Sequence, residues 1–222
     1  MSFYVSITTI SHYKPALDLL LSSLPPSWAR LYILVYQNEP RDDYKVFDDG
    51  HIEVYITNNL SDYGNWVGLH MLLSRGVVPL DSSFLCIHDT CQFVDGDRGA
   101  ELTRQILLDH PESDADVIWM CDTGQCNICI LRKAAIDVGY ERYKDIATMT
   151  KPETIEYEWN HHSLLSAKSF PVRHVFLPSP AFRTGARCVY SSCNERVVLF
   201  YPSISLEKYF FFCLNGIHPM SP

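Results

Sequence analysis

The sequence predicts an α/β protein with a mostly parallel central sheet flanked by helices. Two patterns predict this class. Through residue 121, short β-branched and aromatic runs alternate with segments of helical apolar spacing, which is typical of strands joined by helical crossovers. In addition, Asp81–Phe93 contains a continuous apolar run that ends abruptly in polar residues. That run indicates a buried strand whose polar tip lies at a ligand-binding edge.

The first half of the chain contains the clearest elements. Pro15 suits the first turn of the first expected helix, because the N–H that proline lacks has no helical partner there. Pro25, Gly76 and Pro111 end the three helices. Gln37–Gly50 is expected to be an acidic, irregular loop. The expected strands are Phe3–Thr9, Leu31–Tyr36, His51–Thr57, Phe84–Ile87 and Asp116–Cys121, and the expected helices are Pro15–Leu24, Trp66–Leu73 and Gly99–His110.

The second half is less regular. Thr150 and Glu153 form a capping-box pattern before a helix expected at about 151–167. Two further helices are expected, together with two strand-like runs. The helices are Ile128–Val138 and about 204–213, and the runs are Pro171–Leu177 and Cys188–Tyr201.

Composition limits the possible classes. The 222 residues are 47% hydrophobic and 20% charged, which suits one soluble domain spanning 1–222. The net charge of -8 argues against a nucleic-acid partner. The eight cysteines are interpreted as thiols. Cys126 and Cys129 have zinc-like spacing, but a second such pair is missing, so a structural zinc site is disfavoured.

No apolar run is long enough to span a bilayer, and the N-terminus lacks a signal-peptide pattern. The expectation is a cytoplasmic protein without a transmembrane segment. The apolar segment 205–214 indicates a buried terminal helix, with a membrane or partner contact as the alternative. The oligomeric state stays open.

Three polar clusters follow strands of the first half, namely Thr8–His12, Asn58–Asn65 and His88–Cys91. Parallel strands would bring them to one edge, where ligands bind. Asp89 is therefore the leading candidate, although it could simply begin a turn or cap a helix. The chain has no GxGxxG, GxxxxGK[ST] or GxSxG motif, so classical dinucleotide, P-loop and hydrolase sites are disfavoured. A divalent cation could neutralise a phosphate-bearing ligand instead.

These residues resemble a known family. VSITTIS followed by a leucine-rich helix is similar to the opening of GT-A glycosyltransferases, which are nucleotide-sugar enzymes with a Rossmann-like sheet. Asp89-Thr90-Cys91 stands where that family carries its DxD motif, with Cys91 in place of the second aspartate. Asp122–Asn127 resembles the acceptor-side loop of the family. Among its members, the chain is most like the capsid-glycan glycosyltransferase domains of large chlorella viruses, which implies a viral protein in the host cytoplasm.

The resemblance implies roles for particular residues. Asp89 would bind the metal, Mn²⁺ or Mg²⁺, or the diphosphate. Without a second aspartate, either phosphates, water or a histidine such as His88 complete the metal site, or the enzyme uses no metal; a metal is favoured. For Tyr63, Gly64 and Asn65, a plain turn and helix cap is an equal alternative. The nucleotide-binding residues implied are Thr8, Thr9, Ile10, Tyr63, Gly64, Asn65, His88 and Asp89.

An inverting transfer also needs a carboxylate that takes the proton from the acceptor hydroxyl. Glu153 is expected to serve the capping box, and Glu156 could lie on a solvated face. Asp122, at the end of a strand, and Glu158, beside Trp159, are the leading candidates. Either could instead be an ordinary surface acid.

The implied function is transfer of a sugar from a nucleotide sugar, most simply a UDP-sugar, to a glycan hydroxyl. Residues 1–121 would form the nucleotide-sugar-binding half and residues 122–222 the acceptor-side half. Two alternatives stay open. One is a sugar-nucleotide nucleotidyltransferase, although TTISHYK lacks the glycine-rich basic loop that such an enzyme needs. The other is a non-catalytic nucleotide- or sugar-binding module.

Overall fold

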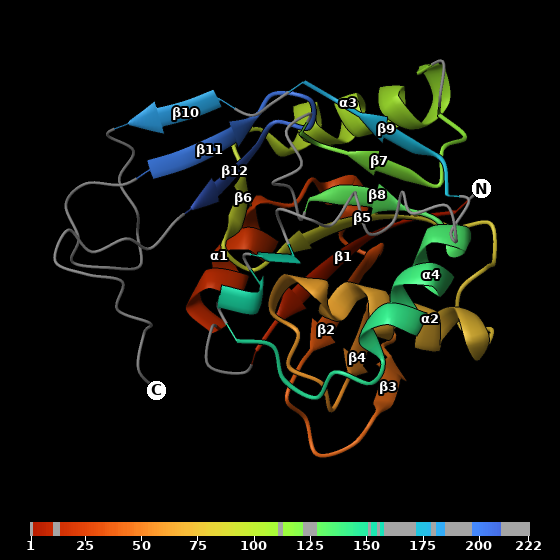
Figure 1. Cartoon of the computed structure of the whole chain (residues 1–222). Helices are drawn as coiled ribbons and strands as arrows, with labels where there is room; N and C mark the ends of the chain where they lie inside the picture. The colour runs from red at the N-terminus through yellow and green to blue at the C-terminus, as the bar shows by residue number, and fades with distance from the viewer. Residues whose placement is uncertain are drawn as a thin grey trace, which may run out of the picture.

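The computed structural model describes residues 2–10, 14–110, 113–121, 128–150, 152–154, 156–157, 172–178, 181–184 and 197–209. This part of the chain is an α/β structure with one large mixed sheet and a second, smaller sheet (Figure 1). The α/β class expected from the sequence is therefore confirmed. None of the described helices is both long and apolar enough to cross a bilayer.

The large sheet has eight strands in the order β3-β4-β2-β1-β5-β8-β7-β9. β4, β2, β1 and β5 run parallel, as do β7 and β9, whereas β3 and β8 are antiparallel to their neighbours. The strands are β1 (Phe3–Thr9), β2 (Tyr32–Tyr36), β3 (Asp43–Val46), β4 (Ile52–Tyr55), β5 (Ser83–His88), β7 (Val117–Trp119), β8 (Cys129–Leu131) and β9 (His174–Phe176).

The small sheet is antiparallel, in the order β10-β11-β12-β6. Its strands are β6 (Cys91–Phe93), β10 (Ala181–Thr184), β11 (Val197–Tyr201) and β12 (Leu206–Tyr209). β6 follows β5 after a two-residue turn, so the two sheets meet at Asp89 and Thr90. This junction places the polar tip of β5 between them.

Helices cover both faces of the large sheet, and each face has its own apolar core. On one face, α1 (Lys14–Ser23) and α3 (Gly96–Asp109) pack with the small sheet against residues such as Ile7 and Ile87. On the other face, α2 (Gly64–Ser74) and α4 (Lys133–Tyr143) pack against residues such as Val35 and Phe84. Because β5 is buried along its whole length, its central residues Phe84–Ile87 form an uninterrupted apolar run rather than an alternating one.

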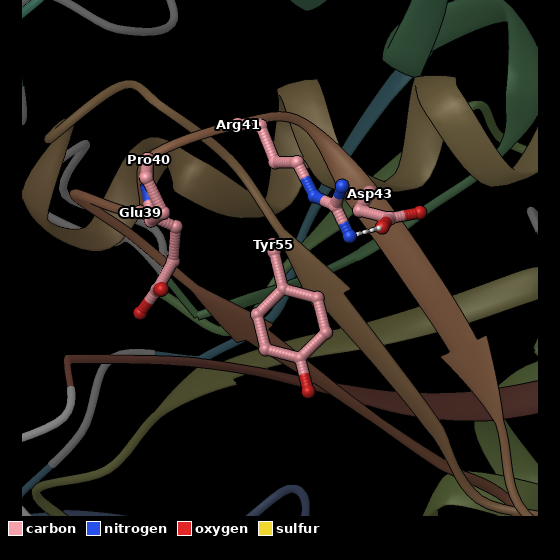
Figure 2. Close-up of a pocket in the computed structure, with 5 residues that line it drawn as sticks. All are labelled: Glu39, Pro40, Arg41, Asp43 and Tyr55. Carbon is pink, nitrogen blue, oxygen red and sulfur yellow. Dashed lines mark ion pairs between the residues drawn. The ribbon is translucent and has the colours of Figure 1, made fainter.

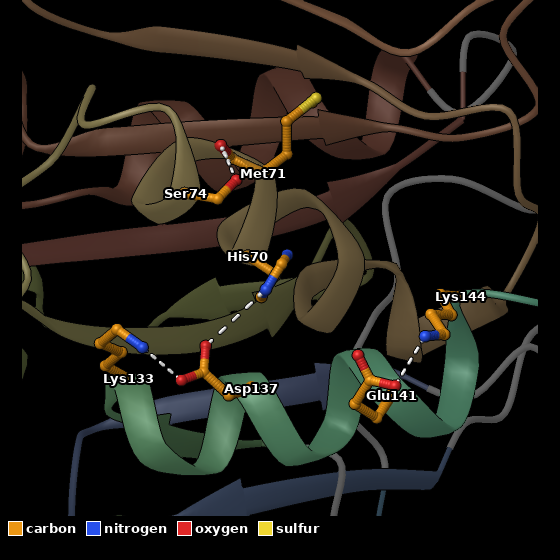
Figure 3. A network of polar contacts seen from close by, with 7 residues as sticks. All are labelled: His70, Met71, Ser74, Lys133, Asp137, Glu141 and Lys144. Carbon is orange, nitrogen blue, oxygen red and sulfur yellow. Dashed lines mark hydrogen bonds and ion pairs between the residues drawn. The ribbon is translucent and has the colours of Figure 1, made fainter.

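α2 and α4 lie side by side (Figure 3). Gly139 makes their close approach possible, since a Cβ there would stand only 2.0 Å from a ring carbon of Trp66. Nearby, the rings of His70 and Tyr140 stack with centroids 3.6 Å apart, and His70 Nε2 lies 3.8 Å from Asp137 Oδ1. The same interface therefore combines tight apolar packing with a polar margin.

Three sequence expectations about elements were wrong. Ile128–Val138 was expected to be one helix, but Cys129–Leu131 forms β8, inserted between β5 and β7, and α4 begins only at Lys133. The helix expected at 204–213 is the strand β12 over Leu206–Tyr209, because these residues pair with β6 and β11. The acidic loop at 37–50 contains β3, which pairs with β4. For β8 and β12, pairing with sequence-distant strands overrode the local pattern, whereas β3 pairs with the next strand along the chain in a hairpin.

Candidate functional site

Polar residues at the carboxyl ends of β1 and β5 meet, as the sequence predicted. Thr8 pairs in register with His88. The Thr9 hydroxyl donates a 2.8 Å hydrogen bond to Asp89 Oδ2, and the Asp89 amide donates to the carbonyl of Thr8 at 3.2 Å. Thr8 and Thr9 are buried, whereas Ile10 is partly exposed at the end of β1. The two strand ends therefore form one connected polar edge.

Asp89 is the buried carboxyl of this edge, with only 7% of its surface exposed. Burial, which disfavours the charged form, raises its pKa to about 7. Repulsion from Asp62 acts in the same direction, and the hydrogen bond from Thr9 opposes both. A carboxyl with this pKa exchanges its proton near neutral pH, so it can act as a proton carrier or as a ligand for a cation.

In the turn after β5, the side chains of Thr90 and Cys91 contact the ring of His88. Thr90 Oγ1 lies 2.7 Å from His88 Nδ1, and Cys91 Sγ lies 3.9 Å from each ring nitrogen of His88. Cys91 is 0% exposed, and burial raises the pKa of its thiol to about 12. Cys91 is therefore a neutral thiol packed in the core and does not supply the negative charge of a second motif carboxylate.

Asn65 connects the start of α2 to the interior of the sheet. Its Oδ1 accepts a 2.6 Å hydrogen bond from the hydroxyl of Ser6, and its Nδ2 donates to the carbonyl of Ile87 at 3.3 Å. Asn65 is buried, so these contacts hold the first turn of α2 against β1 and β5. They favour the interpretation of this turn as a structural element, and direct contact between Asn65 and a ligand stays a prediction.

The segment before Asn65 is held by Gln37, which the sequence patterns did not single out. Its side chain donates to the carbonyl of Ser61 at 2.6 Å and accepts from the amide of Leu60 at 2.7 Å. Gly64 allows this approach, because a Cβ at that position would lie 2.6 Å from the Gln37 amide carbon. Tyr63 is buried as well, with its ring centroid 5.3 Å from that of Tyr143.

Lys208 is a second residue that sequence reasoning missed. It lies opposite Cys91 in the pairing of β12 with β6, and only 6% of it is exposed. Its positive charge acts on the Cys91 thiol in the direction that lowers the pKa. No local pattern could have placed this lysine of β12 beside Cys91, since its position depends on pairing between sequence-distant strands.

The two leading candidates for the catalytic base, Asp122 and Glu158, lie outside the described residues. β7 runs in the same direction as β5, since both pair antiparallel with β8. Cys121 is the last described residue after β7, and the chain there therefore runs toward the edge that carries Asp89. The expected capping box is confirmed, because Thr150 N donates to Glu153 Oε2 at 2.7 Å and Glu153 N donates to Thr150 Oγ1 at 3.5 Å.

Within the described part of the chain, no three His, Cys, Asp or Glu side chains are grouped so that they could hold a metal ion. Asp89 is the carboxyl buried at this edge, and a cation bound to it would take further ligands from a bound anion and water. Mg²⁺ is commonly held in that way, by one or two carboxylates and substrate phosphates. No protein-family model matches the sequence, and neither does any curated protein.

Proposed function

We propose that this chain is a nucleotide-sugar glycosyltransferase of the GT-A type, which moves a sugar from a UDP-sugar to a glycan hydroxyl. The observation that supports this most is the placement of Asp89. It is a buried carboxyl at the carboxyl ends of parallel strands, where the two sheets meet. It accepts a hydrogen bond from the hydroxyl of Thr9. Open α/β sheets bind their ligands at such edges.

Each residue of the edge has a part in this proposal. Asp89 would be the protein's ligand to Mn²⁺ or Mg²⁺, and Thr9 would hold that carboxylate in place through its 2.8 Å hydrogen bond. The cation would stabilise the negative charge that develops on the leaving diphosphate. Thr8, Thr9 and Ile10 would line the nucleoside pocket. Inversion would need a base, for which Asp122 and Glu158 are the candidates.

One observation favours a different class. The position of the second motif carboxylate is taken by the neutral, buried Cys91 thiol, which weakens metal binding by the protein alone. A non-catalytic nucleotide- or sugar-binding module is therefore the second candidate. It predicts UDP binding at the same edge without turnover of any UDP-sugar.

Calorimetric titration with UDP, with and without Mn²⁺, tests the nucleotide site. We expect Mn²⁺ to strengthen UDP binding to the wild type and to leave binding to Asp89→Ala nearly unchanged. Asp109→Ala, which removes an exposed carboxylate at the end of α3, is the matched control and should behave like the wild type. If Asp89→Ala binds UDP and Mn²⁺ as well as the wild type does, the nucleotide site is not at Asp89.

A second experiment separates an enzyme from a binding module. Wild-type protein is incubated with a panel of UDP-sugars and glycan acceptors in Mn²⁺, and the released UDP is measured. Release that depends on acceptor and is lost in Asp89→Ala supports a transferase. UDP binding in the titration together with no release from any donor supports the non-catalytic module.

A further inference from the structure

A small hollow lies at the edge of the large sheet, away from Asp89. Glu39, Pro40, Arg41, Asp43 and Tyr55 line it, and its volume is about 210 Å³ (Figure 2). Figure 2 shows Tyr55 between Glu39 and Pro40 on one side and Arg41 and Asp43 on the other. Pockets that enclose a drug-sized molecule measure roughly 300–1,000 Å³, so this hollow suits a single ring rather than a whole nucleotide.

One wall of the hollow is anchored to the neighbouring strand. The amide of Glu39 donates to the carbonyl of Ile56 at 3.0 Å. The amide of Thr57 donates to Asp42 Oδ1 at 2.7 Å. These bonds tie the connection between β2 and β3 to the end of β4 from both sides. The hollow is therefore largely formed before any ligand binds, which reduces the entropy cost of binding.

Tyr55 supplies the apolar surface. Its ring lies nearly parallel to that of Tyr36, with centroids 5.6 Å apart and planes 13° from each other. Its hydroxyl donates to the Glu53 carboxylate, which holds the ring in one orientation. Burial and the nearby Glu53 raise the pKa of Tyr55 well above its usual value, so the ring stays a neutral phenol.

The rim of the hollow is polar and of mixed charge. Arg41 Nη2 lies 2.9 Å from Asp43 Oδ2, in an ion pair whose side chains are 80% and 43% exposed. Exposed pairs of this kind contribute little to stability. Arg41 and Asp43 can therefore turn toward a ligand at small cost, and Glu39 adds a second carboxylate to the rim.

We propose that this hollow binds one neutral pyranose ring of a saccharide. A pyranose has an apolar C–H face, which would stack on Tyr55, and a rim of hydroxyls that donate to carboxylates and accept from a guanidinium. An anionic ligand would be repelled by the two carboxylates of Glu39 and Asp43 and attracted by the one guanidinium of Arg41. A purely apolar ligand would strip water from the same charged groups without replacing their hydrogen bonds.

The position of the hollow separates it from the proposed nucleotide site. Thr9, Tyr36 and Tyr55 are in register on β1, β2 and β4, and Asp89 follows β5 on the other side of β1. Two strand spacings, or roughly 10 Å, therefore separate Tyr55 from Thr9, and three, or roughly 14 Å, separate it from Asp89. The inference depends on the hollow alone and stands whether or not the chain transfers sugars.

Nuclear magnetic resonance with simple probes tests this inference. The neutral probes are the methyl glycosides of glucose, galactose, mannose and xylose, with glucuronate as the anionic probe and choline as the cationic probe. We expect at least one neutral glycoside to bind saturably and to shift the amide signals of Glu39, Tyr55 and residues 41–43. The shifts on wild-type protein locate the site without any mutation.

Substitutions then test the role of the ring. Tyr55→Ala should weaken binding about tenfold, because it removes the stacking surface, whereas Tyr55→Phe should bind within about threefold of the wild type. Tyr32→Ala is the matched control, since Tyr32 is a partly buried tyrosine on the same strand as Tyr36 and away from the hollow. The inference is overturned if no neutral glycoside shifts these signals, if glucuronate or choline binds there more tightly, or if Tyr55→Ala binds normally.

Discussion

The stability of Asp89→Asn relative to the wild type should rise with pH. The pKa of Asp89 is about 7 in the folded protein and 3.8 in the unfolded chain. Between these values the unfolded chain has already lost the proton that the folded protein keeps, so the stability of the wild type falls as pH rises and levels off above pH 7. One pKa unit corresponds to about 1.4 kcal/mol, so the raised pKa of Asp89 costs the folded protein about 4 kcal/mol at pH 8 and about 2 kcal/mol at pH 5.

Asparagine keeps the acceptor for the Thr9 hydroxyl but does not ionise, so it avoids this cost. Its amide also needs a hydrogen-bond partner, which adds a penalty of about 1–3 kcal/mol that does not change with pH. The informative quantity is therefore the change between two pH values. The advantage of Asp89→Asn should rise by about 2–3 kcal/mol from pH 5 to pH 8.

Thermal unfolding of both proteins in a metal chelator measures this change. For a chain of this size, 1 kcal/mol corresponds to roughly 2–4 °C in Tm, so the Tm difference should widen by about 5–10 °C between pH 5 and pH 8. Asp109→Asn, at an exposed position, should show no such widening. A constant Tm difference between Asp89→Asn and wild type would mean that Asp89 is ionised normally in the folded protein and would refute this reasoning.

Three further predictions concern the α2–α4 interface and Cys91. Gly139→Ala should lower the free energy of unfolding by about 1–3 kcal/mol or more in denaturant titrations, because the new Cβ would overlap the ring of Trp66. Ala134→Ser, at an exposed position of the same helix, should change that free energy little. An unchanged free energy of unfolding in Gly139→Ala would contradict the close approach of the two helices. Cys91 should resist alkylation by iodoacetamide in native protein at pH 8 and react after denaturation, because it is buried with a raised pKa; mass spectrometry that finds it modified in native protein would disprove its burial. Burial is the main cause that lowers the pKa of His70, so protonation of His70 on acidification disfavours the folded state. Between pH 7.5 and pH 5.5, His70→Phe should therefore lose less stability than the wild type. Equal losses of stability in chemical denaturation would count against this.

Much of the large sheet could be predicted from the sequence because its signals are local. β1, β2, β4, β5 and β7 are short apolar or β-branched runs bounded by turn residues or prolines, and each was expected within a few residues of its observed place. The edge at which polar residues gather follows from the parallel arrangement alone. That argument identified Asp89 and Thr9, which the structure joins by a hydrogen bond.

The remaining elements depend on contacts between distant segments. Ile128–Leu131 has the composition of a buried helix or a buried strand, and only its insertion between β5 and β7 decides for the strand. Leu206–Tyr209 is a strand because β6 offers it an open edge. Lys208 and Gln37 were missed for the same reason, since their positions beside the site follow from pairing and from a turn geometry that no short pattern encodes.

The chemistry of Asp89 was also only partly predictable. The sequence placed a carboxyl at the end of a buried strand, but its pKa depends on how completely the two sheets enclose it and on the nearness of Asp62. The state of Cys91, which stands where the resemblance implies a second carboxylate, likewise depends on burial, because the residue is a packed, neutral thiol.

The most direct test of a nucleotide site at Asp89 is paramagnetic broadening by Mn²⁺ in the presence of UDP. Substoichiometric Mn²⁺ is added to isotopically labelled protein with saturating UDP, and the loss of each amide signal is measured. We expect the strongest broadening at Thr9, Asp89 and Thr90, reduced when UDP is omitted and absent in Asp89→Ala. Broadening centred elsewhere, or equal in Asp89→Ala, would contradict a metal-bound diphosphate at this edge.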